Sequence, residues 1–288
     1  MGNRTRRPLS ELYFRKNTPI FRIMETIRPA AVAGLFYPET GKELGRAVRT
    51  LLAHAPANSL VPKALIAPHA GYEYSGPIAA TAYASLAART ARIRRVVLLG
   101  PCHRVAVRGL ALPADDAFAT PLGVVPLDHE AVRAIADLPQ VTVSVAAHAQ
   151  EHALEVQLPF LQVLLGNFSL VPLAVGQATA EEVAEVLDRL WGGEETLVVV
   201  SSDLSHYLPY AKAQVMDRAT AHDILSLHPL DSYDQACGGA PINGLLLVAA
   251  RRGLEPHLLD LRNSGDTSGD HGRVVGYAAF AFTEPEGR

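Results

Sequence analysis

Residues 95–103 read Arg-Val-Val-Leu-Leu-Gly-Pro-Cys-His, an apolar run that stops at a histidine. Two further stretches have the same form. Residues 64–72 read Ala-Leu-Ile-Ala-Pro-His-Ala-Gly-Tyr, and residues 198–207 read Val-Val-Val-Ser-Ser-Asp-Leu-Ser-His-Tyr. Continuous apolar runs of this length predict strands that are covered on both faces, as in a parallel sheet flanked by helices. Each predicted strand leads directly into ionisable side chains.

Helical patterns alternate with these strands along the chain. We expect further strands at 109–112, 170–174 and 274–281, and helices at about 40–54, 77–90, 128–137, 151–165, 179–191, 211–226 and 241–252. This alternation predicts an α/β fold, a single αβα sandwich with a mostly parallel or mixed sheet between two helical layers. The proline-rich segment 109–128 is expected to form an inserted hairpin. Residues 24–288 are predicted to make one domain.

Composition excludes several classes of protein. The 288 residues carry a net charge of −3 and contain no long uncharged apolar run, which argues against nucleic-acid binding and a membrane span. Only Cys102 and Cys237 occur, so we expect no disulfide framework and a cytoplasmic location. Residues 1–23 hold six basic residues and one acidic residue. We interpret them as a disordered tail, with a targeting peptide or a true start at Met24 as alternatives.

The polar residues that follow the three strands predict one shared site. Ligand sites of open α/β sheets form beyond the carboxyl ends of the strands, which is where His69, His103 and Asp203 fall. Two imidazoles and one anionic ligand hold a divalent transition metal and leave positions open. The anionic ligand is either Asp203 or Cys237. The thiol of Cys237 precedes a predicted helix, where a thiolate is favoured.

Residues 148–155, His-Ala-Gln-Glu-His-Ala-Leu-Glu, add a fourth candidate. If this segment is helical, His148 and His152 share a face, and H-x-x-E-H is also a zinc-peptidase pattern. A zinc-dependent hydrolase is therefore one alternative. In a second interpretation, Glu151, His152 and Glu155 face the metal pocket as orienting or acid–base groups. In a third, the acidic residues complement the dipole at a helix start.

Six motifs together carry a family resemblance. They are Ala-Gly-Leu-Phe-Tyr-Pro at 33–38, Pro-His-Ala-Gly-Tyr at 68–72, Leu-Gly-Pro-Cys-His at 99–103, Glu-His-Ala-Leu-Glu at 151–155, Ser-Asp-Leu-Ser-His at 202–206 and Cys-Gly-Gly-Ala-Pro at 237–241. In this order they resemble the Memo family, which includes the AmmeMemoRadiSam system protein B of bacteria and archaea. The resemblance spans about residues 28–283. It implies a fold similar to the LigB-type class III extradiol dioxygenases, which are non-haem iron enzymes.

The resemblance also implies a site. The family's two histidines and one cysteine correspond to His69, His103 and Cys237, while His152, Asp203 and His206 match other pocket positions. The expected metal is iron(II) or copper, with zinc as a third candidate, since a thiolate softens the site relative to a carboxylate. Two departures from the family pattern are Cys102 and Arg104 beside His103. Neither departure removes a ligand. The thiol of Cys102 either makes the site more prone to oxidation or packs as a small apolar side chain.

We therefore expect a metal-binding redox protein that resembles non-haem iron dioxygenases and oxidises a small molecule. His152, Asp203 and His206 are its expected catalytic or orienting groups. The family name implies a link to a radical-SAM protein and an AMMECR1-like protein. The main alternative is an adaptor that uses the same pocket to hold a peptide, because the human member of the family is described as an adaptor in cell motility. Neither nucleic acid nor a membrane is an expected partner.

Overall fold

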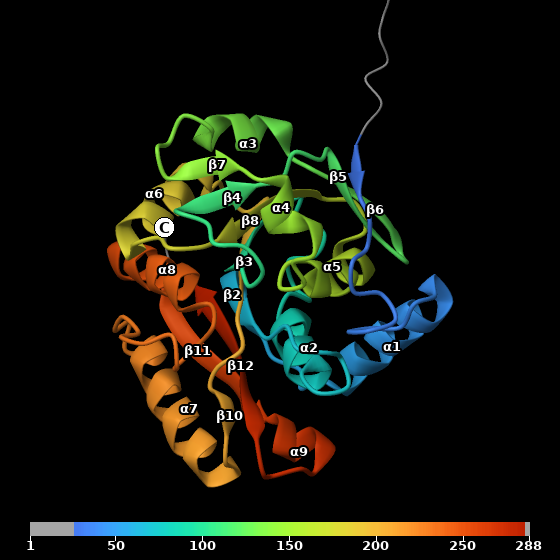
Figure 1. Cartoon of the computed structure of the whole chain (residues 1–288), viewed down its shortest axis with the longest axis vertical. Coiled ribbons are helices and arrows are strands. Elements are labelled where there is room, and N and C mark those ends of the chain that lie inside the picture. Colours follow the sequence, from blue (N-terminus) through green and yellow to red (C-terminus); the bar gives the residue numbers. More distant parts are fainter. Residues whose placement is uncertain (1–25, 286–288) are drawn as a thin grey trace, which may run out of the picture.

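The computed structural model describes residues 26–285, and a nine-stranded mixed sheet runs through the middle of them (Figure 1). The strand order is β10-β12-β2-β9-β3-β8-β4-β7, with β11 paired to β12. The strands are β2 (Pro62–Ala67), β3 (Arg95–Pro101), β4 (Leu110–Leu112), β7 (Val141–Val143), β8 (Ser169–Val175), β9 (Thr196–Ser201), β10 (His206–Leu208), β11 (Glu255–Asn263) and β12 (Val274–Thr283).

The centre of the sheet is parallel, and on each side the next strand joins it antiparallel. Strands β2, β9, β3 and β8 pair in parallel, whereas β4 is antiparallel to β8, and β12 is antiparallel to β2. The three strands with polar ends, β2, β9 and β3, are adjacent, with Ala67 opposite Ser201 and Leu99 opposite Val200. Because they run in the same direction, their carboxyl ends open on one edge of the sheet, as the sequence predicts.

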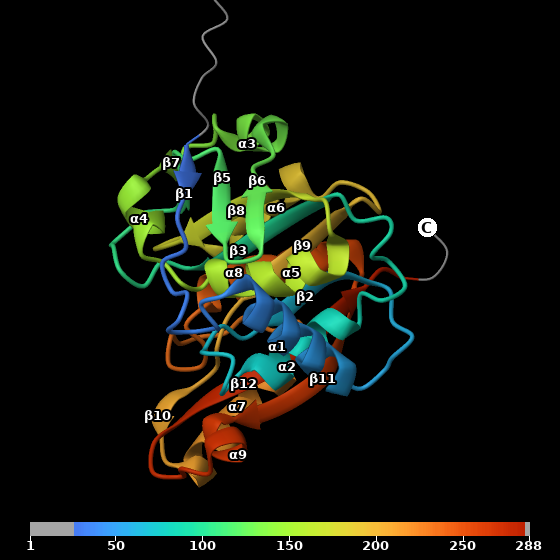
Figure 2. The same cartoon turned by 90° about the vertical axis from the view of Figure 1, so that its right-hand side faces the viewer.

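Two helical layers cover the sheet and define two apolar cores (Figure 2). One layer holds α1 (Gly41–His54), α2 (Gly76–Ala84) and α5 (Leu158–Leu165), and the other holds α3 (His129–Ile135), α6 (Ala180–Leu190), α7 (Tyr210–Leu225) and α8 (Gly239–Arg252). Strand residues alternate between the cores: Leu65 packs in the first and Ile66 in the second. The predicted αβα sandwich is confirmed.

A small second sheet lies beside the main one. It pairs β1 (Ile27–Arg28) with β5 (Ala117–Thr120) and β5 with β6 (Gly123–Pro126), so the hairpin expected at 109–128 is confirmed. The helix predicted at 151–165 starts later than expected, with a 3-10 turn η1 (Glu155–Gln157) before α5. A short helix, α9 (Ser264–Ser268), follows β11.

Two remaining expectations concern the ends of the chain and the membrane. The basic segment 1–23 lies outside the described residues. None of the helices within residues 26–285 has the length and apolar character that a membrane crossing requires.

Candidate metal site

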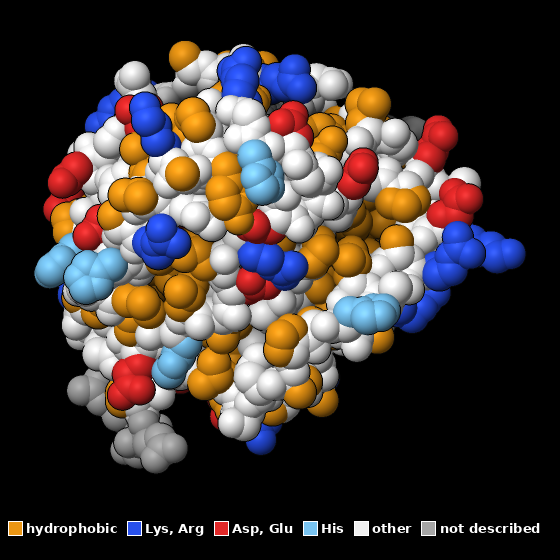
Figure 3. All heavy atoms as spheres, turned by 90° about the horizontal axis from the view of Figure 1, so that it is seen from below, with side chains coloured by type: hydrophobic (Ala, Val, Ile, Leu, Met, Phe, Trp, Pro, Cys, Tyr) orange, Lys and Arg blue, Asp and Glu red, His pale blue; other side chains and the backbone are white. Residues whose placement is uncertain are grey.

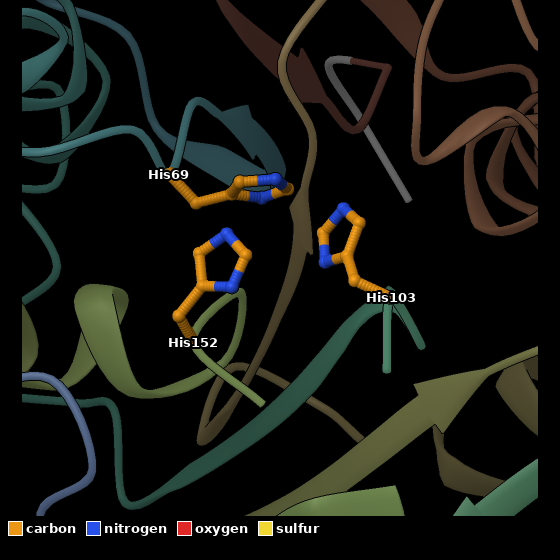
Figure 4. Close-up of side chains that lie close together, drawn as sticks. All are labelled: His69, His103 and His152. Atoms are coloured by element: carbon orange, nitrogen blue, oxygen red, sulfur yellow. The ribbon is translucent and has the colours of Figure 1, made fainter. Parts of the chain in front are cut away.

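Three histidines converge at the carboxyl edge of the central strands. His69 follows β2, His103 follows β3, and His152 comes from the segment before η1 (Figure 4). Ring nitrogens of the three lie within 4.8 Å of one another. The His103 and His152 rings stack with centroids 4.7 Å apart, and the His69 ring stands edge-on to both at 5.3 Å. The sequence placed all three at one pocket, with His69 and His103 as ligands and His152 as an orienting or acid–base group. In the structure His152 lies in the immediate cluster with the other two.

His69 is held in a single tautomer by Ser201. The Ser201 hydroxyl donates to the Ala153 carbonyl at 2.6 Å and accepts from the Gln157 amide at 2.8 Å. Its remaining lone pair accepts from His69 Nδ1 at 2.8 Å, so Nδ1 carries the proton and Nε2 keeps its lone pair. Burial, then the nearby His103, lowers the pKa of His69 to about 3. The imidazole is therefore neutral at pH 7, the form that binds a metal.

His103 is held in the same way by a buried carboxylate. Glu151 accepts from His103 Nδ1 at 2.9 Å, from the His103 backbone N–H at 2.6 Å and from the Ala153 N–H at 2.9 Å. Burial alone would raise the pKa of Glu151, but these hydrogen bonds lower it to about 2. An ionised carboxylate on Nδ1 fixes the ring and leaves Nε2 free, an arrangement common among histidines that ligate metals.

His152 reaches the cluster because the backbone before α5 packs closely against the sheet. At Gly100 of β3, an added Cβ would lie 3.1–3.3 Å from Leu154, Ala153 and Ser201, so glycine permits this approach. The aromatic ring of Phe36 lies 4.6 Å from the His152 ring. Although Nδ1 of His152 is buried, it has no hydrogen-bond partner, with Glu151 Oε1 3.4 Å away. Buried polar atoms without a partner are rare in proteins.

Cys237 lies beside His69 rather than at the centre of the three histidines. Its Sγ is 3.3 Å from His69 Nε2, and it stands outside the group whose ligand atoms all lie within 4.8 Å of one another. The sequence led us to expect that Cys237, at the start of a helix, is a thiolate, and for the metal-free protein this expectation was wrong. Burial, then the Asp203 carboxyl, raises the pKa of Cys237 to about 12, so the thiol keeps its proton and donates to His69. A bound cation would have to displace that proton.

Asp203 positions the backbone of its neighbours. Its Oδ1 accepts from the His69 N–H at 2.8 Å, and its carbonyl accepts from the Cys237 N–H at 3.3 Å. Burial raises the pKa of this carboxyl, and the His69 N–H opposes that rise. Asp203 therefore ties the loop after β2 to the loop before α8. It stands outside the histidine cluster, although the sequence left it open as a ligand.

His206 lines a pocket that opens onto the cluster. It lies on β10 and is half-buried. The pocket has a volume of about 480 Å³ and is lined by His103, His206, Tyr207, Leu208, Met216, Tyr233, Asp234 and Cys237. A cavity that combines two histidines and a thiol with apolar and aromatic side chains has the lining of a binding site for a small molecule.

The H-x-x-E-H segment forms no zinc site. Helix α4 (Val145–Ala149) ends before Glu151, so His148 and His152 do not share a helical face. His148 Nε2 lies 2.8 Å from the Ala111 carbonyl, away from the cluster. The zinc-hydrolase alternative built on this motif was therefore wrong. The helix-dipole interpretation fails for Glu151 for the same reason, because no helix begins there.

Glu155 does not face the pocket, contrary to one interpretation of the sequence. It is fully buried and bonded to Arg28 at 2.6 Å and to the Tyr37 hydroxyl at 2.5 Å. The backbone N–H groups of Ala31 and Val32 also donate to it. Glu155 therefore anchors the segment 28–37 to the body of the domain.

Sequence reasoning missed three residues that shape the site. Ser201 is the last residue of β9, and a small polar residue at that point is the one signal that the sequence offers. Phe36 stands in the motif at 33–38, but nothing in that motif says that its ring reaches His152. Gln157 bears no signal, since it reaches the site only through the packing of segments distant in the sequence.

Comparison with known proteins gives the same family as the motifs. The Memo-like protein family matches residues 28–281. The chain belongs to the Memo family. It is 35% identical to a MEMO1 family protein of Aquifex aeolicus over 271 residues, covering 89% of this chain and 99% of that protein. A Methanopyrus kandleri relative of the same description is 36% identical over 285 residues, covering 88% and 98%.

A solved structure of an uncharacterized Escherichia coli K12 protein shares part of this shape. It covers 76% of this chain and 98% of its own, with 16% identity and a TM-score of 0.47.

Proposed function

We propose that this Memo family protein binds a divalent transition metal through His69 and His103, with Cys237 or His152 as the third ligand, and uses it to oxidise a small molecule. The observation that carries the proposal is the convergence of three imidazoles at a carboxyl sheet edge, within 4.8 Å of one another. Two of them are held with Nδ1 protonated, so Nε2 carries the lone pair that can bind a metal, once the Cys237 thiol releases its hydrogen bond to His69. The buried Nδ1 of His152, which lacks a partner, fits a residue whose polar contacts are completed by a ligand.

The donor set suits iron(II) or copper, with zinc as a third candidate. His69 and His103 are the first two ligands, and the third is Cys237 or His152. A sulfur ligand favours copper or zinc, whereas a third imidazole suits iron, copper and zinc alike. A redox-active metal would supply electron transfer or oxygen activation when bound.

The chain's own residues prepare the site for such a reaction. Ser201 and Glu151 fix the orientation of the two histidine ligands, and Asp203 ties together the loops that carry His69 and Cys237. His206 faces the pocket from β10, and is placed to take or give a proton to a molecule bound there.

Elemental analysis of protein purified without oxygen, chelators or a metal-binding tag tests the proposal. We expect close to one iron or copper per chain. His69→Ala should lower the metal affinity by more than about 100-fold, beyond the 10–100-fold loss typical of residues that only orient a ligand. His129→Ala, which removes an exposed histidine far from the cluster in sequence, is the matched control.

Two further variants identify the third ligand. Cys237→Ser should abolish tight binding if the thiol ligates the metal, and His152→Gln should do so if the imidazole does. Oxygen consumption by the loaded protein then tests the redox reaction. A chain that takes up neither iron, copper nor zinc would overturn the proposal and leave a peptide-binding adaptor as the remaining hypothesis.

A further inference from the structure

Tyr207 has a backbone conformation that residues with a side chain rarely adopt. Among residues 26–285, Tyr207 (φ 59°) and Leu227 (φ 55°) are the two non-glycine residues in the left-handed region. A Cβ crowds the following carbonyl oxygen there, so the conformation persists only where the surrounding structure holds it. Leu227 is half-buried and packs against the second core, which accounts for its strain. Tyr207 is 61% exposed, so the packing of its side chain does not account for its own strain.

The strained conformation belongs to a β-bulge. On β10, the residues before and after Tyr207 pair with consecutive residues of β12, so Tyr207 is an extra residue in the ladder. A bulge residue in the left-handed region is usually glycine, and bulges are common beside functional sites, where they redirect a side chain. Before the bulge, the Gly276 N–H donates to the Ser205 carbonyl at 2.8 Å. After it, the Tyr210 N–H donates to the His271 carbonyl at 3.2 Å, so the chain is held on both sides of Tyr207.

The ring of Tyr207 stands at the pocket that holds His103 and Cys237. Tyr207 is one of the residues that line this pocket of about 480 Å³. The guanidinium of Arg273 lies over the ring, 4.9 Å from its centroid, and the His206 ring stands edge-on to it with centroids 5.8 Å apart. Cation–π and edge-to-face contacts of this kind favour one orientation of a ring. The ring is therefore held in place at the solvent side of the pocket, while more than half of the residue stays exposed.

A second exposed tyrosine lines the same pocket. Tyr233, from the segment before α8, is 68% exposed. Figure 3 views the molecule from the end at which α7 and α9 lie in Figure 1, and hydrophobic side chains are interspersed there with histidines and charged residues. Aromatic rings thus reach this pocket from two separate parts of the chain, β10 and the segment before α8.

We propose that Tyr207 is a specificity-determining residue of this pocket, and that its ring is the surface on which a planar group of the bound molecule stacks. The inference rests on the proposed function, because the molecule bound here is the one that the site would oxidise. Arg273 occupies one face of the ring, and the exposed remainder is open to a ligand. Stacking between planar groups adds to the free energy of burial, and a saturated ring lacks that contribution. The backbone strain is then offset by a contact that forms when the pocket is occupied.

A pair of matched probes tests the inference without metal. Benzyl alcohol and cyclohexylmethanol have the same carbon skeleton and the same hydroxyl group, but only the first has a planar ring. Hydrophobic burial alone favours cyclohexylmethanol, since its ring has slightly more apolar surface. In NMR titrations of the full-length, metal-free protein, we expect benzyl alcohol to bind about twofold to tenfold more tightly, the range that aromatic stacking adds. Equal affinities, tighter binding of cyclohexylmethanol, or no saturable binding of benzyl alcohol would overturn the proposal.

Three variants assign the preference to Tyr207. Tyr207→Phe keeps the ring and should keep the preference. Tyr207→Gly removes the ring and relieves the backbone strain, so the preference should disappear while the melting temperature equals that of the parent or rises. Leu227→Gly is the matched control. It relieves the same kind of strain outside the pocket but loses packing, so its melting temperature should fall and its preference should remain.

The results separate a role in binding from a role in folding. A Tyr207→Gly protein that keeps the preference would overturn the proposal. A melting temperature that falls as far as in Leu227→Gly would assign Tyr207 to the stability of the fold, and would overturn the proposal as well. Because no metal takes part, a chain that prefers benzyl alcohol but takes up no metal would refute the proposed function and not the role of Tyr207. The reverse result would refute only the role of Tyr207.

Discussion

Glu151 and Glu155 are two buried glutamates of one short motif, and they serve different regions of the molecule. Glu151 accepts hydrogen bonds from His103 and from the Ala153 backbone, and so shapes the candidate metal site. Glu155 pairs with Arg28 and accepts from Tyr37, and so holds the N-terminal segment of the domain. Residues four apart on a helix would face the same way. Because the 3-10 turn begins only at Glu155, the irregular backbone before it turns Glu151 toward the site.

The two regions differ in what opposes each carboxylate. Around Glu155 the partner is a guanidinium, and loss of the carboxylate would leave a buried positive charge. Around Glu151 the partners are an imidazole and backbone N–H groups, which carry no full charge when the imidazole is neutral. Changes around Glu155 should therefore lower mainly the stability of the fold, and changes around Glu151 should lower mainly the metal affinity.

Glu155→Ala should have the largest effect on folding. It leaves Arg28 buried without a carboxylate, so we expect the free energy of unfolding to fall by about 3–5 kcal/mol. Urea denaturation followed by circular dichroism measures this loss. A loss below about 1 kcal/mol would show that water reaches Arg28 and that the two regions are not distinct in this way.

Asp217 extends the comparison to a buried carboxyl group that accepts few hydrogen bonds. The Ser205 N–H donates to it at 3.1 Å, and burial raises its pKa to about 6. Since this exceeds the unfolded value near 4, the folded chain holds a proton that the unfolded chain releases, and stability falls as pH rises from about 4 to 6. Relative to the parent, Asp217→Asn should gain up to about 3 kcal/mol over that interval. Denaturation of both proteins at pH 4, 5, 6 and 7 measures the difference, and parallel pH curves would contradict it.

Glu151→Gln should lower metal affinity by about 10–100-fold while costing less stability than Glu155→Ala. The amide keeps the shape of the side chain but loses the charge that favours Nδ1–H on His103. Competition with a chelator of known affinity measures the binding. If metal affinity is unchanged and only the stability falls, Glu151 belongs with Glu155 as a purely structural residue.

Tyr37→Phe should have the smallest effect of these changes. It removes one donor to Glu155 and leaves the Arg28 pair in place, so we expect a loss of about 1.5–3 kcal/mol, near the lower end because other donors remain. Metal affinity should match that of the parent protein. A change in metal affinity would show that the two regions are coupled through the backbone of 151–155.

Sequence patterns predicted the fold well where burial was uniform. The apolar runs in β2, β3, β8 and β9 predicted the parallel centre of the sheet, because strands covered on both faces consist almost entirely of apolar residues. Strand β11 was missed, since its residues are mostly half-buried and its pattern is mixed. The late start of the helix at 151–165 was also missed. That start depends on hydrogen bonds to Arg28 and His103, which come from distant segments.

The site was predictable in part for a similar reason. His69 and His103 follow strands, so topology alone predicts that they meet. His152 reaches them through an irregular segment whose course depends on packing. The protonated state of Cys237 depends on its burial and on the Asp203 carboxyl. Its position before a helix reveals neither of these, so the sequence predicted a thiolate.

Gly100 has a consequence for how this site tolerates change over evolution. Two of the three nearest neighbours of an added Cβ help to orient a histidine: Ser201 bonds His69, and Ala153 bonds Ser201 and Glu151. The third, Leu154, follows His152 by two residues. One added methyl group there would require these neighbours to shift by a few tenths of an ångström. The close approach of the 153–154 segment to β3 and β9 thus depends on the absence of a Cβ, and selection on metal binding would act on a residue that ligates nothing.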